Sequence, residues 1–242
     1  FNKKNPGSFK RKKILKDICF VALTDFGPDL DCILTAYPSI DLKETLPMVM
    51  RDFKQLYLAE AEKYAHVTYF FNGGYAEPVG GEARMFLPSP NVRSYDATPL
   101  MNSVELAKTA LINLKNKWYD FTALNFAAPD MIGHTGNLAA GIKCCEGVDK
   151  LLSQIVKAYL KSQGTIIITA DHGNIEEMIN LKTGEIDTEH STNPVPFILV
   201  NEKIKGKVKL REGGILGDIA PTILELMGLS KPREMTGKSL IK

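Results

Sequence analysis

A short apolar run that ends in a carboxylate and an imidazole constrains the fold of this chain more than any other feature. The β-forming residues Ile166 to Ile168 lead directly into Thr169-Ala-Asp-His-Gly-Asn174. This pattern predicts a buried parallel strand whose carboxyl end presents Asp171 and His172, with Gly173 allowing a sharp turn. In open α/β sheets, ligands bind outside the carboxyl ends of the strands. We therefore expect this pair to lie in a functional site, although an isolated Asp-His pair would more often be only a turn.

A second segment repeats this arrangement. Asn125-Phe-Ala-Ala-Pro-Asp-Met-Ile-Gly-His-Thr-Gly136 follows a mostly apolar run over residues 121–126. Asp130 and His134 are four residues apart, so one turn of helical backbone would direct both side chains to the same point.

A third segment, Glu189-His-Ser-Thr-Asn-Pro194, places His190 in a polar loop before a predicted strand over 195–200. Oxygen and imidazole ligands without thiolates suit Mn²⁺, Zn²⁺ or a similar divalent ion. Two Asp-His pairs and a further histidine are enough to begin a two-metal site of the kind used in phosphoryl transfer. The fourth histidine, His66, lies between Ala65 and Val67 and is interpreted as structural.

Apolar strands alternate with amphipathic helices along most of the chain. Helices are predicted over 45–64, 103–115 with Ser103 as N-cap, 137–162 and 218–227, and strands over 18–24, 67–71, 85–87, 121–126, 166–168 and 195–200. This alternation predicts an α/β fold, a three-layer α/β/α sandwich with a largely parallel central sheet.

Composition excludes several other classes of protein. The 242 residues are 44% hydrophobic and 24% charged, as in an ordinary globular protein, and no apolar run approaches the length of a membrane span. The four cysteines show no CxxC spacing, which favours buried free thiols and a cytoplasmic location. Seven lysine or arginine residues lie within the first sixteen, but no stacking aromatics accompany them, so binding of nucleic acid is not expected.

The three histidine segments resemble the metal-site motifs of cofactor-independent phosphoglycerate mutases, in the alkaline phosphatase superfamily. The resemblance extends through Glu62-Lys-Tyr-Ala-His-Val-Thr-Tyr-Phe-Phe-Asn-Gly-Gly74, Pro88-Ser-Pro90 with Tyr95-Asp96, Leu210-Arg-Glu-Gly-Gly-Ile-Leu216 and Met235-Thr-Gly-Lys238.

This resemblance implies roles for individual residues. Asp130, His134 and His190 would hold one Mn²⁺, and Asp171 and His172 would hold the other, with Zn²⁺, Co²⁺ or Mg²⁺ as possible substitutes. Lys63 matches the family lysine that contacts the substrate phosphate. The implied reaction interconverts 3-phosphoglycerate and 2-phosphoglycerate, in glycolysis and gluconeogenesis, through a phosphoserine intermediate.

The resemblance also implies that part of the protein is missing. The Asp-rich strand end and the nucleophilic Ser of such mutases have no counterpart in this chain. Residues 1–36 would be the last piece of the transferase domain, a remnant of a second α/β domain, and residues 37–242 the phosphatase domain without its N-terminal segment. The missing N-terminal half is expected in the same natural polypeptide, since no initiator Met precedes Phe1, and the complete enzyme is expected to be a monomer that does not associate with membranes.

Three alternatives remain at this level. A related metal-dependent phosphatase or a phosphopentomutase would share the metal pairs. The chain could be an inactive fragment or a subunit that a partner half completes. A nucleic-acid-binding module built on the basic N-terminal run is the least favoured reading.

Overall fold

The computed structural model describes residues 18–24, 34–38, 40 and 42–242. The chain divides into two compact units, 1–41 and 42–242. The basic N-terminal run lies outside the described residues.

The first unit contains one short pair of parallel strands, β1 (Val21–Ala22) and β2 (Leu34–Thr35). The strand predicted over 18–24 is therefore much shorter than expected. Leu34, within this pair, and Leu23, directly after β1, are exposed. Two strands of two residues are too few to form an independently stable sheet.

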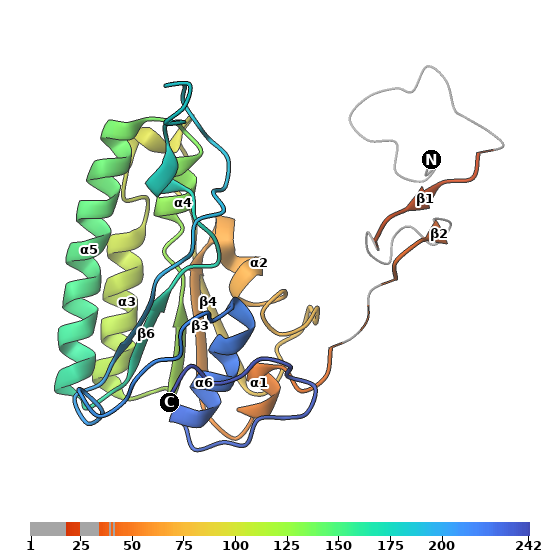
Figure 1. Cartoon of the computed structure of the whole chain (residues 1–242), viewed down its shortest axis with the longest axis vertical. Coiled ribbons are helices and arrows are strands. Elements are labelled where there is room, and N and C mark those ends of the chain that lie inside the picture. The colour runs from red at the N-terminus through yellow and green to blue at the C-terminus, as the bar shows by residue number, and fades with distance from the viewer. Residues whose placement is uncertain (1–17, 25–33, 39, 41) are drawn as a thin grey trace. The chain divides into compact units, whose positions relative to one another are not determined.

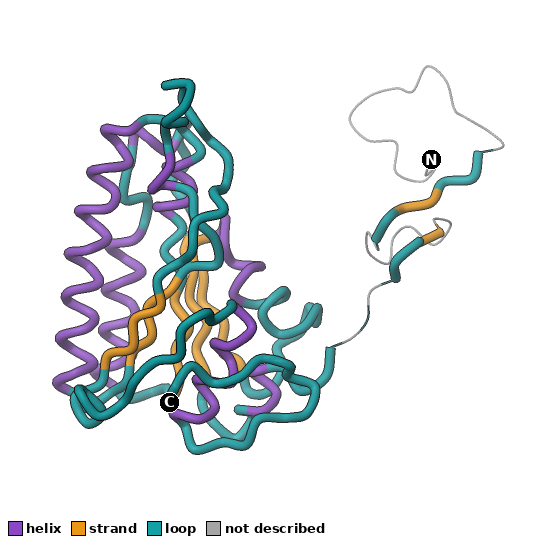
Figure 2. Tube along the Cα trace, viewed as in Figure 1, coloured by secondary structure: helices purple, strands orange, loops and turns teal. Residues whose placement is uncertain are grey.

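The second unit is built on a parallel sheet (Figures 1 and 2). The central strand β3 (Gln55–Glu60) pairs in parallel with β4 (Glu82–Leu87) on one edge and β5 (Phe121–Leu124) on the other. All six residues of β3 are buried, because the strand has neighbours on both edges and helices on both faces.

A separate pair, β6 (Ile166–Thr169) and β7 (Phe197–Val200), is antiparallel. Among the described strands, β5 pairs only with β3 and β6 only with β7, so the two ladders do not join. Ile166 to Ile168 and all four residues of β5 are consequently only half-buried, whereas a continuous sheet would bury them.

Helices cover both faces of the parallel sheet, as Figure 1 shows. On one face lie α3 (Ser103–Asn116) and α5 (Leu138–Lys161), with Leu106 packed against Leu56 and Leu58. On the other face, α1 (Leu46–Val49) and α6 (Ile219–Leu226) pack around Phe121, and α2 (Tyr64–Val67) follows β3. The predicted α/β/α layers and parallel sheet are confirmed.

The strand over 166–168, predicted as buried and parallel, is half-buried and antiparallel, because its neighbour is β7. Two further predicted elements are of the wrong type. Residues 45–64 form the short helix α1, the strand β3 and the 3₁₀ turn Ala61–Lys63, and not one helix. A strand buried on both faces has no polar-apolar alternation, so its apolar residues matched a helical period by chance. The predicted strand 67–71 begins as the end of α2 and continues as a turn, in which Thr68 Oγ1 donates to the Tyr64 carbonyl at 2.8 Å.

Smaller differences concern caps and thiols. Asn102, not Ser103, is the N-cap of α3, and Ser103 is its buried first residue. Cys144 is buried as expected, but Cys19 and Cys145 are exposed, and all three are free thiols. No helix among the described residues is long and apolar enough to span a membrane.

Candidate metal centre

Asp130 and His134 lie on one short helix beyond β5. Helix α4 (Ala128–Gly133) has Pro129 in its first turn, where a missing N–H is tolerated, and His134 follows as its C-cap. His134 Nε2 is 3.3 Å from Asp130 Oδ1, as the four-residue spacing predicts. His134 Nδ1 is 2.7 Å from the Thr188 carbonyl oxygen, so Nδ1 carries the proton that it donates there. The Nε2 lone pair is then directed at Asp130 and available to a metal.

His190 approaches the same point from a distant part of the chain. Its Nε2 lies 3.3 Å from Asp130 Oδ1 and 3.2 Å from His134 Nε2. Two imidazole nitrogens and a carboxylate oxygen therefore lie within 3.2 to 3.3 Å of one another. A divalent cation fits such a set of oxygen and nitrogen donors, which contains no thiolate.

His172 joins this group through His190. The two rings stack with centroids 3.7 Å apart and planes 17° from parallel. One ligand atom each from Asp130, His172 and His190 lie within 4.8 Å of one another, close enough to bind a single ion. This group crosses the expected division, in which His172 belonged with Asp171.

Asp171 lies at the edge of the cluster. Its side chain is 58% exposed, and its Oδ2 is 3.6 Å from His172 Nε2. The predicted pair at the end of β6 is therefore present, with the carboxylate open to solvent and the imidazole turned toward His190.

Lys63 reaches the centre from the opposite side. It ends the 3₁₀ turn Ala61–Lys63 directly after β3, not the end of a helix before a strand as predicted. Its Nζ lies 2.5 Å from Asp130 Oδ2, and both side chains are nearly buried. Burial alone would raise the pKa of Asp130, but hydrogen bonds from Lys63 and Asn174 outweigh it and hold the pKa below its usual value. Asp130 is thus an ionised oxygen ligand at neutral pH.

Two contacts of the centre were not predicted from sequence. Thr188 acts through its carbonyl oxygen, for which the sequence carries no signal. Asn174 was given no role, although its place directly after the Asp-His-Gly run could have suggested one in the centre. A backbone bridge between Gly173 and Ser191 brings these two segments side by side.

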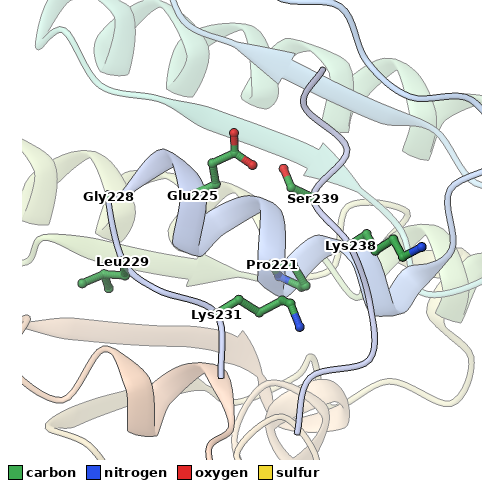
Figure 3. A pocket seen from close by; sticks show the side chains of 7 residues that line it. All are labelled: Pro221, Glu225, Gly228, Leu229, Lys231, Lys238 and Ser239. Carbon is green, nitrogen blue, oxygen red and sulfur yellow. The ribbon is translucent and has the colours of Figure 1, made fainter. Parts of the chain in front are cut away.

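The fourth histidine and one cavity lie outside the metal centre. His66 is exposed and packs against Phe70, with ring centroids 5.7 Å apart. A cavity of about 490 Å³ lies beside α6 and is lined by Glu225, Lys231 and Lys238 among others (Figure 3). Lys231 Nζ donates to the carbonyl oxygens of Pro232 and Met235, so its ammonium group is already hydrogen-bonded. The cavity contains none of the predicted site residues.

One known protein family matches most of this chain. A family model described as the metalloenzyme superfamily matches residues 28–231. The chain belongs to the metalloenzyme superfamily. In this superfamily, donors of the type gathered around Asp130 are consistent with the use of a divalent metal.

Curated relatives of this metalloenzyme chain are 2,3-bisphosphoglycerate-independent phosphoglycerate mutases. The chain is 49% identical over 236 residues to the one from Clostridium botulinum, covering 97% of this chain and 45% of the relative. It is 44% identical over 240 residues to the one from Chloroflexus aggregans, covering 98% and 44%. The predicted resemblance is confirmed, and the chain spans slightly less than half the length of these relatives, matching their C-terminal part.

A solved structure agrees with these relatives. Leishmania mexicana phosphoglycerate mutase, determined at low cobalt concentration, is similar with a TM-score of 0.82 and 28% identity. The similarity covers 92% of this chain and 44% of that protein.

Proposed function

We propose that this chain is the metal-binding part of a cofactor-independent phosphoglycerate mutase, which interconverts 3-phosphoglycerate and 2-phosphoglycerate. The observation that carries the proposal is the convergence of Asp130, His134 and His190 on one point, with distances of 3.2 to 3.3 Å. The names of the relatives support the substrate and the reaction. Glycolytic use, a cytoplasmic location and a monomeric complete enzyme follow from the same assignment.

Two Mn²⁺ ions are proposed as the natural metals, with Zn²⁺, Co²⁺ or Mg²⁺ as substitutes. Asp130, His134 and His190 would hold one, and Asp171 and His172 the other. The exposed carboxylate of Asp171 supports this second role, because it is free to turn toward an ion. When bound, the metals would neutralise charge on a phosphoryl group and lower the pKa of a coordinated hydroxyl.

Lys63 is proposed to bind the substrate phosphate. Its ammonium group is nearly buried beside Asp130, and lysine binds phosphate as a compact point charge. A substrate phosphate would share this ammonium group with Asp130, so the same lysine would connect the substrate to the metal ligand. Transfer is proposed to proceed through a phosphoserine whose Ser lies outside this chain.

The architecture supports a division of labour within a longer protein. Residues 1–36 are proposed as the last piece of the transferase domain and 37–242 as the phosphatase domain. Along the sequence, the division between the two compact units falls between residues 41 and 42, close to the proposed boundary. Among the described strands, β5 and β6 are half-buried and each is paired on one edge, which supports completion of this part by the segment of the relatives that the chain does not match.

Complementation tests this proposal. The chain would be mixed or co-expressed with the part of the Clostridium botulinum relative that it does not match, in Mn²⁺, and conversion of 3-phosphoglycerate to 2-phosphoglycerate would be followed. We expect activity that disappears on chelation and in His190→Ala. Hydrolysis of phosphoesters without isomerisation, or preference for a pentose phosphate, would instead identify a related phosphatase or phosphopentomutase.

A further inference from the structure

Asn174 connects two of the segments that carry metal-ligand candidates. It is almost fully buried, and its Nδ2 donates to Asp130 Oδ1 at 2.7 Å and to the Asp130 carbonyl oxygen at 3.2 Å. Oδ1 is also the oxygen that lies 3.3 Å from both His134 and His190. The amide therefore determines which carboxylate oxygen faces the imidazoles, while Lys63 holds the other.

The neighbouring helix is shaped to accept this amide. A Cβ atom on Gly133 would lie 2.1 Å from Asn174 Oδ1, well inside any permitted contact. The absence of a side chain at position 133 lets Asn174 lie directly against α4. This close approach keeps its Nδ2 within reach of both acceptors on Asp130.

Glu176 extends the connection to the third segment. Its Oε2 accepts from the Asn174 backbone N–H at 2.8 Å. Its Oε1 accepts from Ser191 Oγ and, at 3.1 Å, from Asn193 Nδ2. These two residues lie within three positions after His190 in the chain. A Cβ on Gly173 would lie 2.2 Å from both Glu176 Oε1 and Ser191 Oγ, so these two loops approach as closely as a glycine allows.

We propose that Asn174 and Glu176 are positioning residues that brace the three ligand-bearing segments against one another before a metal binds. The brace runs from Asp130 through Asn174 and Glu176 to Ser191 and Asn193. It sets the carboxylate of Asp130 and holds the loop of His172 against the loop of His190. Partners of this kind typically contribute 10- to 100-fold to metal affinity because they orient the ligands in advance. The inference rests on the metal centre of the proposed function.

Mn²⁺ titration of the chain alone, read as free ion by electron paramagnetic resonance, tests the brace without any enzymatic activity. We expect Asn174→Ala to weaken the affinity about 10- to 100-fold, and the conservative Glu176→Gln to weaken it about 10-fold. Because both residues act through one hydrogen-bonded path, the fold-loss of Mn²⁺ affinity in the double variant should be smaller than the product of the two single fold-losses. The visible absorption of bound Co²⁺ should also change in Asn174→Ala, since the orientation of Asp130 changes.

Asn180→Ala is the matched control. Asn180 lies in the same segment between β6 and β7, but among the described residues its side chain accepts only from the Lys182 and Thr183 backbone N–H groups. This variant should bind Mn²⁺ as the wild type does. Thermal unfolding of each metal-free variant separates positioning from loss of fold, and if Asn174→Ala unfolds, the exposed and conservative Glu176→Gln carries the test.

The outcomes distinguish the two proposals. One outcome would overturn the brace and leave the metal centre standing. In it, the wild type binds Mn²⁺, and Glu176→Gln and folded Asn174→Ala bind it with affinities unchanged to within about twofold. A wild-type chain that binds no Mn²⁺ would overturn the metal centre, and the brace with it.

Discussion

Lys63 Nζ lies 2.5 Å from Asp130 Oδ2, joining the end of β3 to α4 by a nearly buried ion pair. The pair lies at the carboxyl ends of two adjacent parallel strands, since β3 and β5 pair in register over Gln55 to Leu58. It combines a group suited to bind phosphate with a group suited to bind metal. Its removal therefore has consequences for stability and for chemistry.

Lys63→Met should lower the free energy of unfolding by about 2 to 4 kcal/mol in urea at pH 7. A nearly buried carboxylate that loses its cation keeps its desolvation cost, which the hydrogen bond from Asn174 offsets only in part. Lys108→Met is the control, because Lys108 pairs with Glu105 at 3.4 Å on the exposed side of α3. That change should cost no more than about 0.5 kcal/mol. Equal losses in the two variants would show that the Lys63 pair is no stronger than a surface pair.

Mn²⁺ affinity of the chain should fall as the pH is lowered from about 8 to about 5. Imidazoles must be neutral to bind a metal, so protons compete with the ion for these ligands as the pH falls. Because the centre contains three histidines, His134, His172 and His190, binding of each metal ion should displace more than one proton over this pH range. Calorimetric titration at several pH values measures this, and an affinity that stays constant over the range would contradict the participation of histidines.

Glu60 should make the chain less stable as the pH rises. The pKa of Glu60 is raised from 4.5 to about 7, mainly by burial and further by the charge of Glu62. A backbone hydrogen bond from Asn102 opposes this rise in part. Because the folded-state pKa exceeds the unfolded one, the stabilising contribution of the protonated form is complete below about pH 4.5. It is lost as the pH rises through about 7.

Glu60→Gln should therefore gain stability relative to the wild type between pH 5 and pH 8, by roughly 1 to 3 kcal/mol in urea unfolding. Glu105→Gln, which removes an exposed carboxylate on α3, should follow the wild-type profile. If the difference between Glu60→Gln and the wild type does not vary with pH, Glu60 does not titrate in this way.

Gly133→Ala should destabilise the chain by about 1 to 3 kcal/mol, because the new methyl group would overlap Asn174 Oδ1. Gly217→Ala is the control, since a Cβ there meets only Ile215 at an ordinary distance of 3.7 Å or more. Thermal unfolding compares the two. A Gly133→Ala variant as stable as Gly217→Ala would mean that Asn174 can shift at little cost.

How far the sequence predicts this structure depends on the range of the interactions involved. The long helices α3 and α5 were predicted closely, because their apolar positions repeat with a helical period and each buries one stripe against the sheet. Strand β3 was predicted as part of a helix, because its burial depends on β4 and β5 at its edges and on helices over its faces, which lie far from it in sequence.

The candidate site shows the same division. The donor chemistry, the spacing of Asp130 and His134 and the positions of His172 and His190 at loop starts could be predicted from the sequence, because these depend on residue type and local backbone geometry. The stacking of His172 on His190, the pairing of Lys63 with Asp130 and the hydrogen bond from Asn174 to the same carboxylate could not. These contacts join residues 18, 67 and 44 positions apart, and packing of the layers, which no local pattern encodes, brings them together.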